Sequence, residues 1–342
     1  MNWRAFGTSG LKVSELCLGT MTLAGQADAK TSYAILDTAW KGGIRFLDTA
    51  DVYPVPMTLA TYGGSEALLG RWMASRKCRD DLIVATKGYF NAGPLPIHRG
   101  NSRLHLIRAC EGSLRRLKTD RIDVYLCHGW DPTVPVEETL RALEQLKRDG
   151  KVLYTGVSNL RAHELAGALV ESARLGLRGF EGIQPRYSVI QREAEESLFP
   201  LARRFGLGVM VYNPIAGGIL AGKHRPGRPP TAGTRFAMPG IGEVYRKRYW
   251  DQRVLEEALV LKRDVAAAGL SLVTASVAWV LSHPDVSCAI IGASRPDQLR
   301  DHLRATTTVL PDQIRARLDR VWFDLPRRKP DLDSPRIENF HG

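Results

Sequence analysis

The 342-residue sequence has no long apolar run and no regular array of cysteines. Its longest nearly unbroken apolar stretch, Leu272 to Leu281, is about half the roughly 20 residues that a membrane-spanning helix needs. The five cysteines form no Cys-x-x-Cys pair, so the sequence predicts neither a disulfide framework nor a zinc site. The N-terminal residues lack the apolar block of a signal peptide. We therefore expect a cytoplasmic protein with no membrane span and no bound metal.

Acidic side chains are fewer than basic ones, 36 against 48, which gives a formal net charge of +12. This excess suits an anionic partner, such as a nucleotide phosphate, an acidic substrate, a nucleic acid or a membrane surface. Residues 223–253 concentrate it, with eight Lys or Arg against two acids in a segment rich in Gly and Pro, which predicts a basic loop. Because the sequence contains no nucleic-acid recognition motif, we expect no nucleic-acid partner.

Apolar runs alternate with amphipathic segments, which is typical of an α/β protein with a parallel sheet. The amphipathic segments predict helices at 30–41, 103–117, 136–148, 161–174 and 195–205. The predicted strands are Glu15–Gly19, Arg45–Ala50, Leu82–Gly88, Ile122–His128, Leu153–Ser158, Phe180–Tyr187, Gly208–Tyr212 and Cys288–Ala293. Eight such units predict a (β/α)₈ TIM barrel. A doubly wound sheet is the competing fold, but no Gly-x-Gly-x-x-Gly follows the first strand.

The two ends of the chain carry additions to this barrel. Gly7-Thr8-Ser9-Gly10 stands between two short apolar segments and predicts a β-hairpin that plugs the bottom of the barrel. We assign residues 1–325 to a single barrel domain with an extra C-terminal helix. Residues 326–342, with prolines at 326, 330 and 335, are expected to form an extended tail.

Ionisable residues follow the second, third and fourth predicted strands: Asp48 and Tyr53, then Lys87, then His128. The catalytic groups of such a barrel gather at the carboxyl ends of its strands, so these four side chains are expected to converge. Tyrosine is a poor acid at neutral pH unless a nearby cation lowers its pKa, and we expect Lys87, held by Asp48, to be that cation. Each residue also has a purely structural alternative. Asp48 and Lys87 could form a structural ion pair, His128 could be a core histidine, and Tyr53 could serve only for packing.

The same residues carry a family resemblance. Asp-x-Ala-x-x-Tyr at 48–53, Thr-Lys at 86–87 and the later histidine resemble the catalytic tetrad of the aldo-keto reductases. Gly-Val-Ser-Asn at 156–159 strengthens the resemblance, which is closest to the branch of aflatoxin-aldehyde reductases and potassium-channel β-subunits. It implies NADPH-dependent reduction of a small aldehyde or ketone to an alcohol. Tyr53 would be the general acid, tuned by Asp48 and Lys87, and His128 would orient the carbonyl.

The resemblance also implies where NADP(H) binds. Strand ends supply the nicotinamide contacts Ser158, Asn159 and Gln184, and Tyr212 stacks on the ring; for Gln184, a hydrogen bond inside the barrel is the structural alternative. The remaining implied cofactor contacts are Asn213, Pro214, Ile215, Gly217, Lys223, Arg235, Gly292, Ser294, Arg295, Gln298, Asp301 and His302. Relatives commonly have Asn in place of His302 and a longer acid in place of Asp301. A P-loop is excluded, because His224 follows Gly222-Lys223 where Mg²⁺ binding needs Ser or Thr.

Trp130 and Tyr89 are expected to border the substrate, beside a Pro-rich loop at 54–62. Two other functions are weighed against carbonyl reduction. One is an NADP(H)-binding regulatory barrel with little turnover. The other is a Schiff-base aldolase that uses Lys87, which is disfavoured because Asp48 would keep the lysine charged. Assembly into a homo-oligomer stays open.

Overall fold

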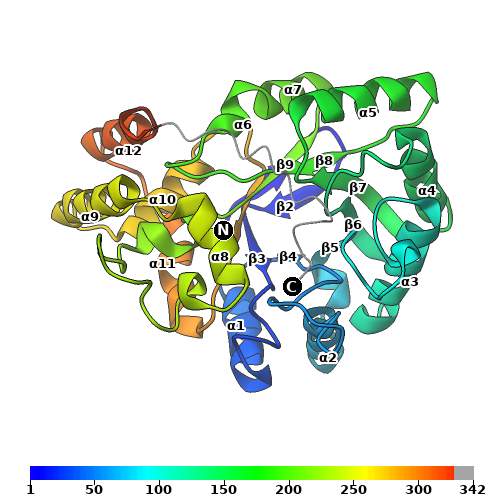
Figure 1. Cartoon of the computed structure of the whole chain (residues 1–342), viewed down its shortest axis with the longest axis horizontal. Coiled ribbons are helices and arrows are strands. Elements are labelled where there is room, and N and C mark those ends of the chain that lie inside the picture. Colours follow the sequence, from blue (N-terminus) through cyan, green and yellow to red (C-terminus); the bar gives the residue numbers. More distant parts are fainter. Residues whose placement is uncertain (327–342) are drawn as a thin grey trace.

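Eight parallel strands close into a barrel in the computed structural model, which describes residues 1–326 (Figure 1). In order around the barrel they are β3 (Leu16–Gly19), β4 (Phe46–Asp48), β5 (Ile83–Gly88), β6 (Ile122–Cys127), β7 (Val152–Ser158), β8 (Gly182–Gln184), β9 (Gly208–Tyr212) and β10 (Cys288–Ile291). Pairing of β10 with β3 closes the barrel. The predicted fold class is confirmed. The predicted tail lies, from residue 327 on, outside the described residues.

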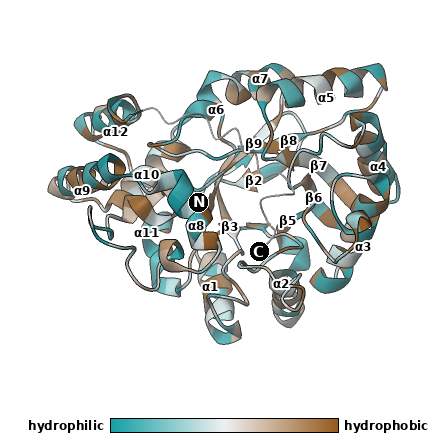
Figure 2. Ribbon diagram, viewed as in Figure 1, coloured by the Kyte–Doolittle hydropathy of each residue, from teal (hydrophilic) through white to brown (hydrophobic). Residues whose placement is uncertain are grey.

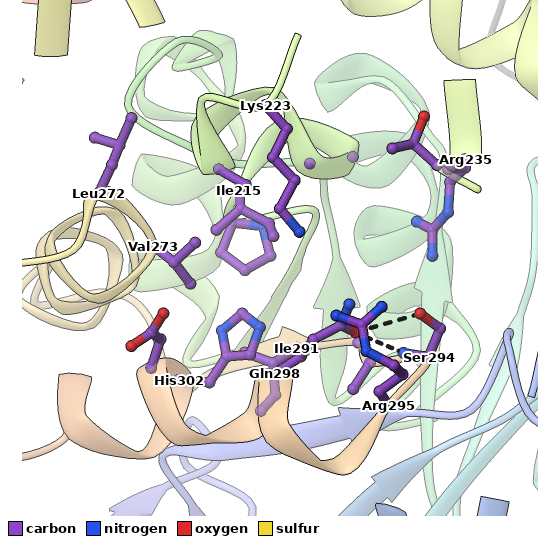
Figure 3. Close-up of a pocket in the computed structure, with 18 of the residues that line it drawn as sticks. Ile215, Lys223, Arg235, Leu272, Val273, Ile291, Ser294, Arg295, Gln298 and His302 are labelled. Carbon is purple, nitrogen blue, oxygen red and sulfur yellow. Dashed lines mark hydrogen bonds between the residues drawn. The ribbon is translucent and has the colours of Figure 1, made fainter. Parts of the chain in front are cut away.

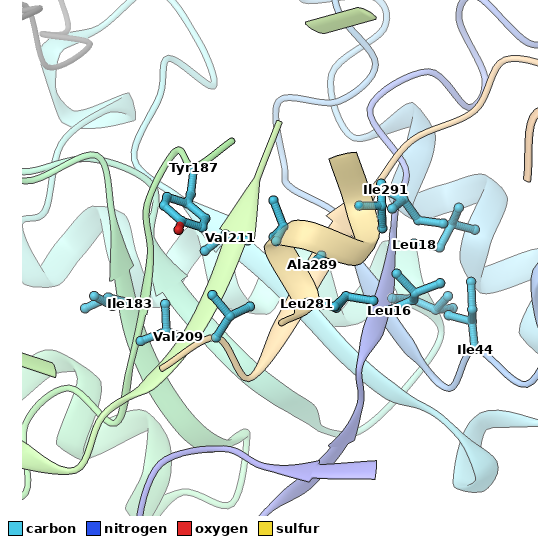
Figure 4. Close-up of a cluster of buried hydrophobic side chains, with 14 of the residues drawn as sticks. Leu16, Leu18, Ile44, Ile183, Tyr187, Val209, Val211, Leu281, Ala289 and Ile291 are labelled. Atoms are coloured by element: carbon cyan, nitrogen blue, oxygen red, sulfur yellow. The ribbon is translucent and has the colours of Figure 1, made fainter. Parts of the chain in front are cut away.

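Side chains that point alternately to the two faces of each strand build the two layers of the core. In β3 and β10, Cys17, Cys288 and Ile290 belong to the apolar cluster inside the barrel. Their neighbours, such as Leu16, Leu18, Ala289 and Ile291, belong to the second cluster, between the strands and the outer helices (Figure 4). Successive side chains on a strand point to opposite faces, so apolar residues at every position indicate a strand that is buried on both sides.

The outer helices form a ring around the strands (Figure 1). They are α1 (Ala29–Lys41), α2 (Gly64–Arg76), α3 (Arg103–Leu117), α4 (Val136–Arg148), α5 (Ala162–Arg174), α7 (Leu198–Phe205), α9 (Gln252–Ala267), α10 (Leu272–Leu281), α11 (Leu299–Ala305) and the C-terminal α12 (Asp312–Asp324). Helix α4 illustrates their two-sided character (Figure 2): Leu140, Leu143 and Leu146 are buried, whereas Arg141 and Arg148 pair with acids one turn away on the exposed side.

Two predicted segments differ from the structure. The single helix expected at 195–205 is broken at Ser197, whose φ of −147° is not helical, into α6 (Glu193–Glu196) and α7. The basic loop expected at 223–253 contains helix α8 (Ile241–Tyr249) and the first residues of α9. Helix α8 forms because Ile241, Val244 and Tyr245 recur at helical spacing and turn toward one cavity.

The N-terminal hairpin consists of β1 (Trp3–Ala5) paired with β2 (Lys12–Ser14), as the turn sequence predicts. Phe6 follows β1, is fully buried, and meets the ring of Phe46 edge-on at 6.4 Å between centroids. Its ring also fills the space beside Gly182 and Gly208, the first residues of β8 and β9. The hairpin therefore plugs the amino-terminal end of the barrel and leaves the carboxyl end for chemistry.

Two further observations concern residues 1–326 as a whole. In that range no single helix is long and apolar enough to cross a bilayer, and only α9 and α10 taken together, bent by 90°, meet the criteria of length and composition. The same residues contain no group of three or more His, Cys, Asp or Glu side chains placed to hold a metal ion. All five cysteines are buried as free thiols.

Candidate active site

The structure brings together the four ionisable residues at the carboxyl ends of β4, β5 and β6. Asp48 is the last residue of β4 and pairs with Ala85 of the neighbouring strand β5, and Lys87 lies two residues further along β5, so its side chain points to the same face. The Lys87 Nζ atom lies 2.7 Å from Asp48 Oδ2 and 5.0 Å from the centre of the Tyr53 ring. The rings of Tyr53 and His128 meet edge-on, with centroids 5.8 Å apart. The carboxyl end of the barrel thus holds an acid, a cation, a phenol and an imidazole in contact.

Asp48 organises this cluster through both of its carboxylate oxygens. Oδ2 accepts from Lys87, whose fully buried ammonium also donates to the Thr49 carbonyl at 2.7 Å. Oδ1 accepts from Gln184 Nε2 at 2.8 Å. The structure therefore shows for Gln184 the barrel hydrogen bond that was its alternative, and this bond ties the expected nicotinamide contact directly to Asp48. A buried charge pair of this kind needs such additional hydrogen bonds to offset desolvation.

The expected lowering of the Tyr53 pKa is wrong for this structure. Burial, followed by the negative charge of Asp48, raises the pKa of the Tyr53 phenol well above its usual value, and Arg235 opposes this shift. The physical reason is that the charge of Lys87 is directed at Asp48 and the Thr49 carbonyl, while the phenol loses its water. Tyr53 is accordingly a protonated hydroxyl at neutral pH.

His128 is a neutral imidazole. Burial, together with the charge of Lys87, lowers its pKa well below the usual value. Its ring packs edge-on against Phe90 at 4.8 Å, and its Nδ1 atom is buried without a hydrogen-bond partner in the described part of the chain. A neutral imidazole keeps one N–H, so this ring can donate to a substrate oxygen without carrying charge.

The expected nicotinamide residues form a connected set beside this cluster. Ser158 Oγ donates to the carbonyl of Gln184 at 2.8 Å, and Asn159 Nδ2 donates to the carbonyl of His128 at 2.8 Å. The Tyr212 hydroxyl donates to Asn159 Oδ1 at 2.7 Å. The ends of β7, β8 and β9 are thereby fixed to one another and to the loop that carries His128.

Two adjoining cavities open at this end of the barrel. The first, of about 300 Å³, is lined by Asp48, Tyr53, His128 and a largely apolar wall; we call it the catalytic cavity. The second, of about 600 Å³, is lined by residues of the loop after β9 and of the start of α11; we call it the cationic cavity. Both are lined by Thr22, Asn213, Arg235, Ile290, Ile291 and Gly292, so the cavities share one wall.

The residues of the cationic cavity fit a dinucleotide phosphate. Lys223 and Arg235 approach it from one side, and Ser294, Arg295 and Gln298 from the other (Figure 3). Ser294 donates to Gln298 Oε1 through its backbone N–H at 2.8 Å. These cations, the hydroxyl and the amide are the donors that phosphate oxygens accept. The predicted contacts Asn213, Pro214, Ile215, Gly217, Gly292 and Asp301 also line this cavity.

His302 provides a second test of whether the cationic cavity suits a dinucleotide, because its ring points into this cavity (Figure 3). Burial lowers its pKa to about 4, so the ring is neutral. Its Nδ1 atom is buried and has no hydrogen-bond partner among the described residues. A buried ring nitrogen without a partner is costly, and an adenine amino group is a donor of suitable chemistry for it.

Residues of the loop after β9, such as Lys223, Gly233 and Arg235, line the cationic cavity. The Gln26 amide donates to the carbonyl of Gly233 at 3.3 Å, which joins this loop to the one after β3. Within the short 3₁₀ segment Ala216–Ala221, Gly217 and Gly218 have φ values of 67° and 111°. A side chain at Gly217 would also overlap the Tyr245 ring, so glycine lets the backbone approach the cavity here.

Tyr89 and Trp130, the two residues expected to border the substrate, lie away from the catalytic cavity. Tyr89 is buried and donates to the Trp130 carbonyl at 3.0 Å, and neither residue is among the described residues that line the catalytic cavity. That wall is formed instead by Phe90 and by residues of α8. The sequence did not identify four lining residues of α8: Ile241, Val244, Tyr245 and Arg248. Their i, i+3, i+4, i+7 spacing indicates a common helix face, but not that this face borders a cavity.

Comparison with known proteins agrees with this geometry. The sequence profile described as "Aldo/keto reductase family" matches residues 15–322. An uncharacterised oxidoreductase of Bacillus subtilis is 36% identical over 329 residues, which cover 94% of this chain and 96% of that protein. A probable voltage-gated potassium channel β subunit of Oryza sativa is 34% identical over 333 residues, covering 96% and 98%. One of Arabidopsis thaliana is 32% identical over 335 residues, covering 96% and 98%. The resemblance inferred from the motifs is confirmed.

Proposed function

Since this chain belongs to the aldo/keto reductase family, a family of NAD(P)-dependent oxidoreductases, we propose that it reduces an aldehyde or ketone to an alcohol with NADPH. The observation that carries the proposal is the contact between the Tyr53 phenol, the neutral His128 ring and the Lys87–Asp48 pair in one cavity. That cavity shares a wall with a second, cationic one. The nicotinamide, when bound, supplies the hydride for the carbonyl carbon.

Tyr53 supplies the proton. Because its pKa is raised, its hydroxyl carries a proton throughout the neutral range. In the proposed step the Tyr53 O–H bond breaks, an O–H bond forms on the substrate oxygen, and the phenolate later recovers a proton from solvent. Arg235, whose charge opposes the rise of the Tyr53 pKa, and Lys87, 5.0 Å from the ring centre, are the cations that stabilise the transient negative charge. The N–H of neutral His128 donates to the same substrate oxygen and directs it toward Tyr53.

The proposed nicotinamide contacts are Ser158, Asn159, Gln184 and Tyr212, and their mutual hydrogen bonds support this assignment because they hold polar groups in place at three strand ends. In the cationic cavity, Lys223 and Arg235 are assigned to the pyrophosphate. Ser294 and Arg295 are assigned to the 2′-phosphate of the adenosine, which favours NADPH over NADH.

Deuterium transfer tests the proposal. The protein is incubated with NADPH that carries deuterium at both C4 positions of the nicotinamide and with 4-nitrobenzaldehyde, and the alcohol is analysed by mass spectrometry and NMR. We expect one deuterium at the carbinol carbon and consumption of NADPH at 340 nm. An alcohol without deuterium, or absence of turnover by a protein that binds NADPH, would contradict the proposal.

The potassium channel β subunits among the relatives support a second candidate, an NADP(H)-binding regulatory barrel with little turnover. Steady-state kinetics with a panel of aldehydes separates the two candidates. A regulatory barrel is expected to oxidise one equivalent of bound NADPH and then exchange its cofactor slowly, whereas a metabolic reductase turns over repeatedly.

A further inference from the structure

We propose that Tyr62 and Arg116 are positioning residues for the proton donor: through Asp51 they fix the turn that carries Tyr53. This inference rests on the proposed function and deepens it, because it explains how the general acid of the same site is held. Asp51, Tyr62 and Arg116 are not among the described residues that line the catalytic cavity, so they act from outside it.

Asp51 lies inside the turn that carries Tyr53. A hydrogen bond from the Tyr53 N–H to the Ala50 carbonyl, at 3.1 Å, closes this turn. The backbone N–H of Asp51 donates to the Lys87 carbonyl at 3.1 Å, which joins the turn to β5. A displacement of Asp51 is therefore transmitted to the phenol through two residues of backbone.

The Asp51 carboxylate is held by the far end of the same loop. Its Oδ2 atom accepts from the Tyr62 hydroxyl at 2.7 Å. The segment between these two residues includes Val55, Pro56 and Met57, which line the catalytic cavity. One hydrogen bond therefore closes a loop that bears both the proton donor and part of the cavity wall.

Helices α2 and α3, which lie side by side outside β5 (Figure 1), supply the residues that hold Tyr62. The guanidinium carbon of Arg116 lies 5.0 Å from the centre of the Tyr62 ring, in a cation–π contact. Arg116 Nε donates to Glu66 Oε2 at 2.7 Å. Glu66 Oε1 in turn accepts from the hydroxyl of Thr86, which precedes Lys87 in β5. The contacts thus form a closed circuit that begins and ends on β5.

Asp51 and Glu66, the two acids of this circuit, are fully buried. Burial and the charge of Glu66 raise the pKa of Asp51, whereas the Tyr62 hydrogen bond and the charge of Arg116 oppose this shift. A side chain at Gly63, the residue before α2, would overlap the Arg116 stem, so the arginine is closely packed there. Because a buried carboxylate without a partner is costly, Asp51 is expected to stay bound to Tyr62, which leaves the loop one preferred position.

The variant Tyr62→Phe tests this inference, because it removes the hydroxyl that binds Asp51 and keeps the ring beneath Arg116. Tyr187→Phe is the matched control. It also removes a tyrosine hydroxyl that donates to a carboxylate, that of Glu195, and Tyr187 is not among the described residues that line either cavity. Both substitutions are made in the wild type and in Tyr53→Phe. Each rate is measured by mass spectrometry of the deuterated alcohol formed from 4-nitrobenzaldehyde and the labelled NADPH.

In the wild-type background we expect Tyr62→Phe to lower kcat about tenfold, because a small misplacement of a catalytic group slows the chemical step. The KM for the aldehyde and the Kd for NADPH should stay within about twofold of their wild-type values. In the Tyr53→Phe background the same change should alter kcat by less than about twofold, since no hydroxyl is left to align. Tyr187→Phe should leave kcat unchanged in both backgrounds.

Equal fold losses from Tyr62→Phe in the two backgrounds would overturn the inference, because Tyr62 would then not act through Tyr53. An unchanged kcat in the wild-type background, or an equal loss in Tyr187→Phe, would overturn it as well. In each of these cases the proposed function stands. An inert wild type, or a Tyr53→Phe variant with the wild-type kcat, would overturn both.

Discussion

The ammonium nitrogen of Lys87 lies 2.7 Å from Asp48 Oδ2 in a site where the lysine is fully buried. Removing one member of such a pair leaves the other charge without its partner, which typically costs about 3–5 kcal/mol. We expect Lys87→Met to lower the free energy of unfolding by that amount in urea titrations. Lys151→Met is the control: Lys151 pairs with Glu111 at 2.9 Å, but both are partly exposed, so its loss should be about 1 kcal/mol or less. Similar losses in the two variants would contradict the account.

A second carboxylate, that of Asp51, is fully buried two residues before Tyr53 in the same loop. It accepts from the Tyr62 hydroxyl at 2.7 Å, and its Oδ1 atom has no hydrogen-bond partner in residues 1–326. Burial and the nearby charge of Glu66 raise its pKa to about 7, against about 3.9 in an unfolded chain. Between these values the folded protein binds more protons than the unfolded one, so ionisation of Asp51 lowers stability as the pH rises from about 4 to about 7.

Asp51→Asn removes this ionisation and keeps an N–H donor where the protonated acid has its O–H. We expect the stability of this variant relative to the wild type to increase from pH 5 to pH 7 and then to level off. Asp37→Asn is the control of opposite sign, because the hydrogen bond from Arg76 lowers the Asp37 pKa and the ionised form is stabilising. This control should lose stability throughout pH 5–8. A difference between Asp51→Asn and the wild type that stays constant over this range would show that Asp51 ionises normally.

The plug at the bottom of the barrel depends on glycine. A Cβ atom at Gly208 would overlap the Phe6 ring, so Gly208→Ala should lower the melting temperature, with a loss of about 1–3 kcal/mol. Combining it with Phe6→Ala should cost less than the sum of the two single changes, because that change removes the ring atoms that the new Cβ would overlap. Gly167→Ala, at an open position on α5, should instead stabilise by up to about 1 kcal/mol. If the stability loss of the double variant equals the sum of the two single losses, Phe6 does not contact Gly208.

The cofactor preference is tested at Arg295, which lines the cationic cavity and whose side chain is 59% exposed beside Asp297. Arg295→Ala should raise the Kd for NADPH about tenfold or more and leave that for NADH nearly unchanged, because only NADPH carries the 2′-phosphate. Fluorescence titration measures both constants. Arg300→Ala, which removes an exposed arginine from α11, is the control and should change neither. Parallel weakening of both cofactors would assign Arg295 to another part of the dinucleotide.

Much of the fold could be predicted from local patterns. Each barrel strand is a short apolar run, and the polar residues at three strand ends converge because neighbouring parallel strands end at the same edge. The hairpin could be predicted from Gly7-Thr8-Ser9-Gly10 and the two short apolar segments that flank it. These features depend on residues adjacent in the chain, which is why the sequence reveals them.

Features set by tertiary contacts could not be predicted in this way. Helix α8 is rich in Arg and Lys and follows Pro239-Gly240, so its composition resembles a loop, and its apolar face becomes meaningful only once a cavity lies beside it. The direction in which the Tyr53 pKa shifts depends on how deeply the phenol is buried, and the motif does not contain this information. The structure likewise places Tyr89 behind Phe90 rather than at the cavity, although the two are neighbours in the sequence.

The most direct test of the account is the kcat of Tyr53→Phe for NADPH-dependent reduction of an aromatic aldehyde, measured at 340 nm beside the wild type. If Tyr53 is the proton donor, kcat should fall roughly 100-fold or more, while fluorescence titration shows unchanged NADPH binding. A variant that binds NADPH and retains the wild-type kcat would contradict the assignment of Tyr53 as the general acid.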